Sequence, residues 1–301
     1  MTADRYSAVV RVLYRVLFLN LAVAFAKLAL GYTTGAVSVL SDGFHSLTDS
    51  ASNVVALVGV SVARRPPDAN HPYGHRKYET MASLGILLFL IIVLVEVVSS
   101  ALDRLKSGAV PKVYPEGIGI MIVTLVVNVV VVAYELRQGR RFNSEVLLAD
   151  AKHTRSDVLT SITVIAALVG VGAGYPLLDP LAALFVAGFI GYACWEIAQG
   201  ASRILADEIV IAQDDLREIV LAVPDVIGCH QIRTRGSADH VFVDMHLWLD
   251  GAKSLQDAHA TSHVVKDTLM ARFPQIADVV IHIEPPPPDP PGREASETPR
   301  D

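Results

Sequence analysis

Two stretches of the sequence, SDGFHSLTDSASN at 41–53 and ADAKHTRSDVLTS at 149–161, each place a histidine four residues before an aspartate. Residues four apart share one face of a helix, with about 5–6 Å between their Cβ atoms. Each pair could therefore hold one cation, and two pairs on facing helices would supply four ligands. Two imidazoles and two carboxylates suit tetrahedral Zn²⁺, whereas Mg²⁺ and Ca²⁺ prefer oxygen cages of higher coordination. The spacing predicts a metal site made of His45, Asp49, His153 and Asp157.

These pairs lie in segments long enough to cross a membrane. The chain has 301 residues, of which 52% are hydrophobic and 19% charged, and its mean hydropathy is +0.43. Such values favour membrane spans over a soluble globular fold. Apolar windows of about 20 residues, the length that a helix needs to cross a bilayer, fall at about 10–32, 36–63, 81–102, 118–134, 146–172 and 180–201. We expect a membrane protein with a bundle of six transmembrane helices.

The second and fifth windows are the least apolar, and both are amphipathic. Their polar residues share one face at helical spacing and are Ser38, Asp42, His45, Asp49 and Ser52 in the second window and Asp150, His153 and Asp157 in the fifth. An ionisable residue within a span costs about 2.5–3.5 kcal/mol on the insertion scale, so it is functional by default. A single pair could be a polar bridge between helices, but two pairs on two amphipathic spans favour a metal site inside the bundle.

The basic residues near the span ends predict the orientation. One side of the membrane carries Arg5, Arg64, Arg65, Arg76, Lys77, Arg137, Arg140, Arg141 and Arg203, and the other only Arg104, Lys106 and Lys112. The positive-inside rule then predicts that both termini are cytoplasmic, in a multi-pass protein of a cell (inner) membrane. The first residues do not resemble a cleaved signal peptide. The net charge of −6 argues against nucleic acid as a partner, and two cysteines make neither a disulfide framework nor a cysteine zinc knuckle.

The chain changes character after the sixth window. DDLREIVLAV predicts a short helix, HVFVDMHLWLD and DVVIHIE alternate as half-buried strands, and Ser254 can cap a helix that runs to Phe273. The predicted architecture is a transmembrane domain at 1–205, a small cytoplasmic α+β (αββαβ) domain at 206–285 and a disordered proline-rich tail at 286–301. A domain of this size buries little surface alone, so a partner chain could complete it.

With these features in place, the chain resembles the cation diffusion facilitators, a family of divalent-metal/proton antiporters. The resemblance rests on His45/Asp49 in the second span, His153/Asp157 in the fifth, the number of spans and the second domain. It implies a homodimer that exports Zn²⁺ from the cytoplasm in exchange for protons by alternating access. The exchange is also physically reasonable, because metal binds neutral imidazole and ionised carboxylate and therefore displaces protons.

The resemblance implies further residues. Asp68, His71 and His75 in the first cytoplasmic loop match the family's loop-borne zinc site, although such histidines could also simply meet water or headgroups. The family's metal site in the cytoplasmic domain corresponds to His230, His246, His259, His282 and Glu284, with Glu284 where the family often has Asp and with His263 as an additional candidate. Lys77 and Asp207 resemble a salt bridge between the two domains, and two separate solvated charges are the alternative.

Three alternatives remain open at this stage. The main substrate could be Fe²⁺, Mn²⁺, Co²⁺ or Cd²⁺, but His45, where many relatives have Asp, favours Zn²⁺ because nitrogen ligands suit borderline ions. A membrane metalloenzyme would need an open coordination position, and four protein ligands leave none, so no enzyme activity is expected. A membrane-anchored metal sensor or scaffold would not need the buried charges of the two spans.

Overall fold

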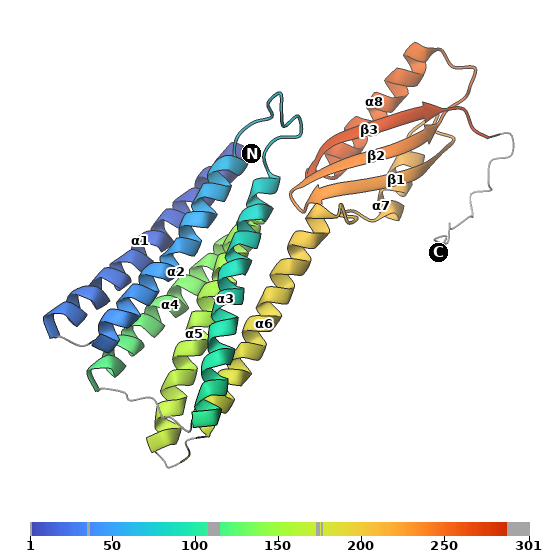
Figure 1. Ribbon diagram of the computed structural model, residues 1–301. Coiled ribbons are helices and arrows are strands. Elements are labelled where there is room, and N and C mark those ends of the chain that lie inside the picture. The colour runs from blue at the N-terminus through green and yellow to red at the C-terminus, as the bar shows by residue number, and fades with distance from the viewer. Residues whose placement is uncertain (1, 35–36, 108–114, 173–174, 176, 288–301) are drawn as a thin grey trace. The chain divides into compact units, whose positions relative to one another are not determined.

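The computed structural model describes residues 2–34, 37–107, 115–172, 175 and 177–287. Within these ranges it leaves out the side chains at 2–4, 30–31, 33–34, 37–45, 48–49, 115–118, 120–121, 160, 164–172, 178–179 and 182. The described residues form two compact units that divide between Ser202 and Arg203. The first unit is helical, and the second contains a small sheet (Figure 1).

The predicted set of six long helices is confirmed. The helices are α1 (Thr2–Thr34), α2 (Val37–Ala63), α3 (Lys77–Ser107), α4 (Pro115–Phe142), α5 (Glu145–Gly172) and α6 (Leu178–Leu205). Nearly all of them extend beyond the apolar windows of the sequence, and α4 continues past Tyr134 to Phe142. Hydropathy marks the part of a helix that lipid covers, whereas the hydrogen-bonded helix continues into the polar residues beyond it.

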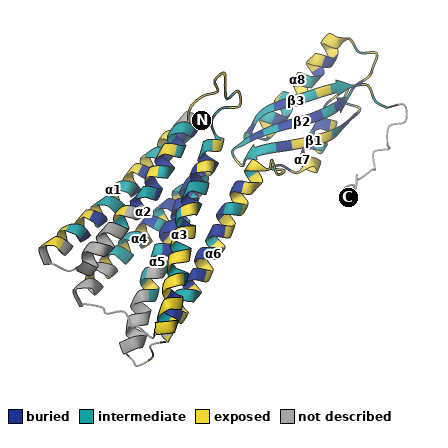
Figure 2. Cartoon of the chain, viewed as in Figure 1, coloured by how far each residue is buried: buried dark blue, intermediate teal, exposed yellow. Residues whose placement is uncertain are grey.

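The helices bury one face and expose apolar side chains on the other. In α1 the buried residues Tyr6, Val9, Leu13 and Val16 recur at helical spacing, whereas Phe18 and Phe25 are exposed. Exposed residues, drawn in yellow, recur along the helices of this unit (Figure 2), and many of them are large and apolar. In a water-soluble protein such a surface would drive association, but lipid tails cover it without cost.

Hydropathy alone identifies four of these helices as long and apolar enough to span a membrane among the described residues. They are Arg5–Ala29, Lys77–Ser107, Ile122–Phe142 and Ala183–Leu205. These segments belong to α1, α3, α4 and α6, so the two helices that are left are α2 and α5. On α2 the described residues form a shorter apolar segment, Ser50–Ala63.

The bundle brings α2 and α5 into contact with each other and with α3. Gly59 on α2 faces α3 so closely that a Cβ at this position would overlap the Cβ of Ala82 and lie tightly against the carbonyl oxygen of Tyr78. Small residues at such a crossing let two membrane helices approach at backbone distance. Helix α5 also packs against α4, so its polar face lies among several helices.

The second unit has the predicted αββαβ order. Its elements are α7 (Gln213–Leu221), β1 (Gly228–Ser237), β2 (His240–Trp248), α8 (Leu255–Arg272) and β3 (Ile276–Glu284). Strand β2 is central, antiparallel to β1 and parallel to β3. Val241, Val243, Met245 and Leu247 are the buried face of β2 and pack with Leu216 of α7 and with Val265 and Leu269 of α8. As predicted, Ser254 caps α8 and accepts a hydrogen bond from the Asp257 N–H.

Candidate metal centres

Within the bundle, His153 on α5 is the clearest candidate for a metal ligand. Its side chain is only 3% exposed, and neither ring nitrogen has a hydrogen-bond partner among the described residues. A buried imidazole without partners is costly, so its nitrogens are suited to a ligand that enters the bundle. Asp157 follows one turn later and is partly buried. The side chains of His45 and Asp49 lie outside the described part of the chain, so the four-residue site stays a prediction.

Polar side chains surround this part of α2 and α5. On α2, Ser46 accepts a hydrogen bond from Lys27 Nζ of α1 at 2.8 Å, and Asn53 Oδ1 accepts one from Asn20 Nδ2 at 2.8 Å. Asp150, one turn before His153, accepts hydrogen bonds from Asn53 Nδ2 and, at 3.2 Å, from Ser52 Oγ. These bonds join α1, α2 and α5 at the level of the predicted ligands.

Sequence reasoning missed Glu135 on α4, whose carboxyl group is buried beside Asp150. The fourth apolar window ends at Tyr134, so Glu135 reads as the first polar residue after a span. Helix α4 continues for seven residues beyond Glu135, to Phe142. Glu135 therefore lies inside the helix, among the packed helices, and the length of α4 is the feature that could have identified it.

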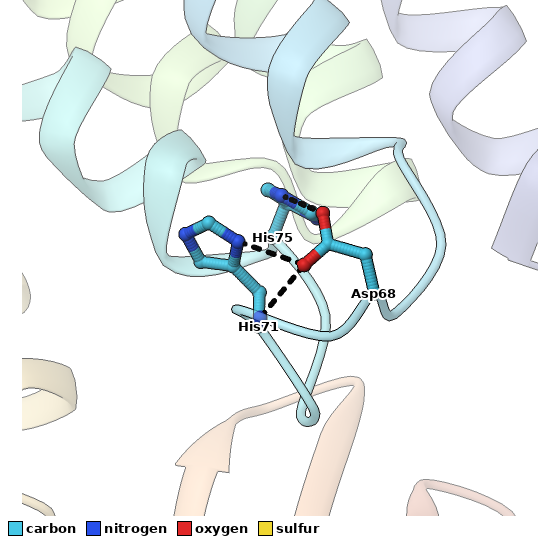
Figure 3. Close-up of side chains that lie close together, drawn as sticks. All are labelled: Asp68, His71 and His75. Carbon is cyan, nitrogen blue, oxygen red and sulfur yellow. Dashed lines mark hydrogen bonds and ion pairs between the residues drawn. The ribbon is translucent and has the colours of Figure 1, made fainter.

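The predicted loop residues come together in the segment between α2 and α3 (Figure 3). Asp68 Oδ1 lies 3.1 Å from His71 Nδ1, and Asp68 Oδ2 lies 3.3 Å from His75 Nε2. The two imidazole rings are 4.2 Å apart between centroids. One atom from each of the three residues falls within 4.8 Å of the others, so the three could hold one divalent ion.

Backbone hydrogen bonds orient the side chains of Asp68 and His75 in this loop. The His71 N–H donates to Asp68 Oδ1 at 2.7 Å and is the main cause that lowers the pKa of the Asp68 carboxyl below its usual value, so this group is ionised at neutral pH. His75 is 5% exposed, and its Nδ1 lies 3.2 Å from the carbonyl oxygen of Pro66. Donation to that carbonyl leaves the lone pair of Nε2 directed at Asp68, which is the tautomer a metal requires.

In the second unit, three histidines form a row across the sheet. The register pairs His230 of β1 with His246 of β2, and His246 with His282 of β3. Ring centroids are 4.9 Å apart for the first pair and 4.7 Å apart for the second. The row lies on the face of β2 opposite the buried apolar residues, because side chains alternate along a strand.

Glu284 completes this cluster from the next row of the sheet. Its carboxylate contacts His230 Nε2, lies 3.5 Å from His246 Nδ1 and 3.9 Å from His282 Nε2, and accepts a hydrogen bond from Trp248 Nε1 at 2.9 Å. The hydrogen bond with His230 is the main cause that lowers the pKa of Glu284 below its usual value, and Trp248 adds to it. His230, His246 and Glu284 could together hold a metal ion.

A β-bulge follows His230 and shifts the register of β1 against β2 after this residue. The register of β1 and β2 shifts between His230 and Arg233, and Gln231 adopts a φ of 50°. Bulges of this kind are common beside functional sites, where they redirect a side chain. Sequence alternation did not reveal this bulge, nor the donor role of Trp248.

Two predicted groups are not assembled by these contacts. His259 lies on α8 in ring contact with His263, at 4.6 Å between centroids, and is not part of the described group that could hold an ion. The grouping of His259 with the sheet histidines therefore remains a prediction, because no contact between His259 and these histidines is found among the described residues of the single chain. The proposed salt bridge between Lys77 and Asp207 joins residues of different units and also remains a prediction.

Comparison with known proteins agrees with both units. Residues 13–206 match the family described as the cation efflux transmembrane domain, and residues 211–286 match the cytoplasmic domain of the cation efflux protein. The chain is 30% identical over 267 residues to an uncharacterized transporter of Methanocaldococcus jannaschii, which covers 88% of this chain and 94% of the relative. It is 32% identical over 270 residues to a cation-efflux pump FieF of Serratia proteamaculans, covering 86% of this chain and 87% of the pump.

Solved structures are similar to about a quarter of the chain. One is the cytosolic domain of a cation diffusion facilitator family protein, with 32% identity, a TM-score of 0.23 and coverage of 24% of this chain and 86% of that domain. Another is the metal-bound C-terminal domain of the CzcD transporter from Thermotoga maritima, with 30% identity, a TM-score of 0.22 and coverage of 25% and 94%.

Proposed function

The chain belongs to the cation efflux family of membrane transporters, and we propose that it exports Zn²⁺ from the cytoplasm in exchange for protons. The observation that carries this proposal is the buried imidazole of His153, which has no hydrogen-bond partner among the described side chains and lies one turn before Asp157 on a helix that contacts α2. Helix α2 carries His45 and Asp49 at the same spacing. The four side chains supply two nitrogen and two oxygen donors, the set that suits tetrahedral Zn²⁺.

The same donors explain why export would be coupled to protons. Imidazole must be neutral and carboxylate ionised before either can bind a metal, so each binding event releases protons. When the site opens to the more acidic side, protonation weakens the same bonds and expels the ion. Unperturbed imidazole titrates near pH 6.5, which places the exchange within reach of physiological gradients.

The remaining parts of the chain fit around this exchange. We propose that the loop residues Asp68, His71 and His75 bind metal near one end of the spans, and that the histidine row with Glu284 binds a structural or regulatory Zn²⁺. The protein would act as a homodimer in the inner membrane, with both termini in the cytoplasm. Residues 1–205 would form the transport domain, 206–285 the metal-binding and dimerisation domain, and 286–301 a tail.

The test is metal flux in proteoliposomes that contain the purified protein and a Zn²⁺ indicator. An opposing pH gradient is expected to drive Zn²⁺ uptake, and collapse of the gradient is expected to stop it. Asp49→Ala and Asp157→Ala should each abolish the flux while the protein still elutes as a folded species. Asp103→Ala, which removes an exposed carboxylate from α3, is the matched control and should retain flux.

Other ions are compared in the same vesicles. Co²⁺, Cd²⁺, Mn²⁺ and Fe²⁺ are offered one at a time, and Zn²⁺ is expected to move fastest. Wild-type vesicles that bind Zn²⁺ but move no ion under any gradient would favour a membrane-anchored sensor instead. Flux that survives both aspartate substitutions would show that the site is elsewhere.

A further inference from the structure

Two carboxyl groups outside the predicted ligand set are completely buried in the helical unit. Glu135 on α4 and Asp150 on α5 are each 0% exposed, and their carboxyl groups lie within hydrogen-bonding reach of each other. Among the described residues, no lysine or arginine forms an ion pair with either group. Two adjacent carboxylates without a counter-charge cannot both remain ionised in a membrane interior, so the pair must hold a cation or a proton.

The hydrogen bonds indicate which group carries the proton. Asp150 accepts from Asn53 and Ser52 of α2, so both of its oxygens are stabilised as an anion. Glu135 Oε1 has no hydrogen-bond partner among the described donors. Its Oε2 receives a long bond of 3.4 Å from Thr154 Oγ1, whose proton is shared with the Asp150 carbonyl at 3.1 Å. A carboxylic acid at Glu135 that donates to Asp150 satisfies both groups.

The pair is placed where a transported ion would act on it. Asp150 is one turn from His153, and its donors Ser52 and Asn53 follow Asp49 by about one turn on α2. The charged or titratable groups that act on the pair from α5 are His153 and Asp157, whereas the described α2 partners are neutral amide and hydroxyl groups. A dication between α2 and α5 would therefore favour the ionised form of Glu135 through its positive charge.

We propose that Glu135 carries one of the exchanged protons, at a position separate from the metal ligands. In the metal-free chain Glu135 is a neutral acid hydrogen-bonded to Asp150. When the cation binds, the O–H bond of Glu135 breaks, and the proton leaves to water on the side from which the cation entered. The return of a proton to Glu135 restores the pair after the cation departs. This inference rests on the proposed function, which makes protons the counter-ions.

Infrared difference spectroscopy of the full-length chain in detergent tests the protonation directly. Glu135→Gln keeps the shape of the side chain, and its amide can still donate to Asp150, but it has no titratable proton. The metal-free wild type is expected to show a carboxylic acid C=O band that is absent from Glu135→Gln and that Zn²⁺ removes from the wild type. Asp103→Asn near the end of α3, where the carboxyl group is exposed, is the matched control and should leave that band unchanged. A band that persists in Glu135→Gln, or is absent from the wild type, overturns the proposal.

Proton counting then tests the role in exchange. Zn²⁺ binding to Glu135→Gln at constant pH is expected to release about one proton fewer per ion than in the wild type, while binding at alkaline pH is retained. A merely structural role would lower binding at every pH and leave the proton count unchanged. If Glu135→Gln does not fold, Glu135→Asp replaces it, and an unshifted infrared band then contradicts the assignment. Wild-type vesicles without proton-coupled flux would refute the proposed function, whereas the infrared band would still decide the state of Glu135.

Discussion

At the scale of single residues, the three groups of proposed metal-binding side chains differ in how the protein positions them. In the part of the chain that the structure describes, His153 is buried without hydrogen-bond partners, His75 is oriented by a backbone carbonyl, and Glu284 is held by His230 and Trp248. A ligand without other partners binds and releases a metal without first breaking protein contacts, as a transport site requires. A ligand that is already held in place suits an ion that stays.

The identity of residue 45 should control which ion is carried. His45→Asp exchanges one nitrogen donor for oxygen in the proposed site, which reduces its preference for borderline ions. We expect a severalfold increase of Mn²⁺ flux relative to Zn²⁺ in metal-resolved vesicle assays, because carboxylate oxygen suits the harder ion. His240→Asp, the same change at a half-buried histidine of β2 outside the proposed metal sites, serves as the control. An unchanged ion profile in His45→Asp would contradict the assignment of His45 as a ligand.

The carboxyl group of Glu284 should titrate below its ordinary value of 4.5 in the metal-free protein. Because the folded pKa is lowered, the stabilisation from this contact is fully present above pH 4.5 and is lost as the pH falls through the folded pKa. His230→Ala removes the main cause and should move the midpoint back toward 4.5. The carbon-13 resonance of the Glu284 carboxyl, followed against pH, measures both values. Equal midpoints in the two proteins would contradict the assigned cause.

At the scale of elements, the ends of the helices are joined by polar contacts around Arg5. Arg5 of α1 donates to the carbonyl oxygens of Phe142 and Asn143 after α4, at 2.6 and 2.7 Å, and pairs with Glu79 of α3 at 3.0 Å. Glu79 also accepts from Ser144 Oγ at 2.5 Å, just before α5. Four helices therefore meet at one ion pair, and Arg5 satisfies carbonyls at the end of α4 that lack helical partners.

Loss of Arg5 should therefore destabilise the bundle. Arg5→Ala leaves Glu79 buried without its cation and exposes the α4 carbonyls, a change that costs on the order of 3 kcal/mol. Thermal unfolding of the purified protein in detergent should show a clearly lower midpoint than the wild type. Arg11→Ala, on an exposed position of the same helix, should unfold like the wild type. Similar midpoints for both variants would show that the contact contributes little.

Much of this architecture could be predicted because it depends on local patterns. Apolar windows located six helices, strict alternation located β2, and Ser254 with Asp257 located the start of α8. The approach of Asp68, His71 and His75 was also predictable, since all three lie within one short loop. The row of His230, His246 and His282 was predicted only as a set that the family resemblance implies, because strand register is not visible in the sequence.

Other features depend on contacts between distant segments. Glu135 can be recognised as a candidate proton carrier only because Asp150 of α5 lies beside it. From the sequence Arg5 contributes only to the predicted membrane orientation, and its ion pair with Glu79 of α3 is visible only in the structure. The apolar windows also end before the helices do, because the polar residues in the last turns of a helix are stabilised by ion pairs and hydrogen bonds rather than by lipid. The bulge after His230 arises from the pairing of β1 with β2, and the local sequence pattern does not predict it.

At the scale of the whole molecule, the chain combines a helical transport unit with a unit that can hold metal of its own. The family matches cover both units, from residue 13 to 206 and from 211 to 286. In the proposed cycle, the helical unit exchanges one dication for protons, with Glu135 as a proton carrier beside the site. The metal bound by the second unit would report the cytoplasmic supply of the same ion.

The most direct measurement is X-ray absorption of Zn²⁺ bound to a chain that lacks the other two sites. Asp68→Ala, His71→Ala, His246→Ala and Glu284→Ala are combined for this purpose, so that only the site between α2 and α5 remains. The account predicts one Zn²⁺ with two nitrogen and two oxygen neighbours at about 2.0–2.2 Å, and its loss after a further Asp157→Ala substitution. A shell of six oxygens, or a zinc signal unaffected by Asp157→Ala, would contradict the central claim.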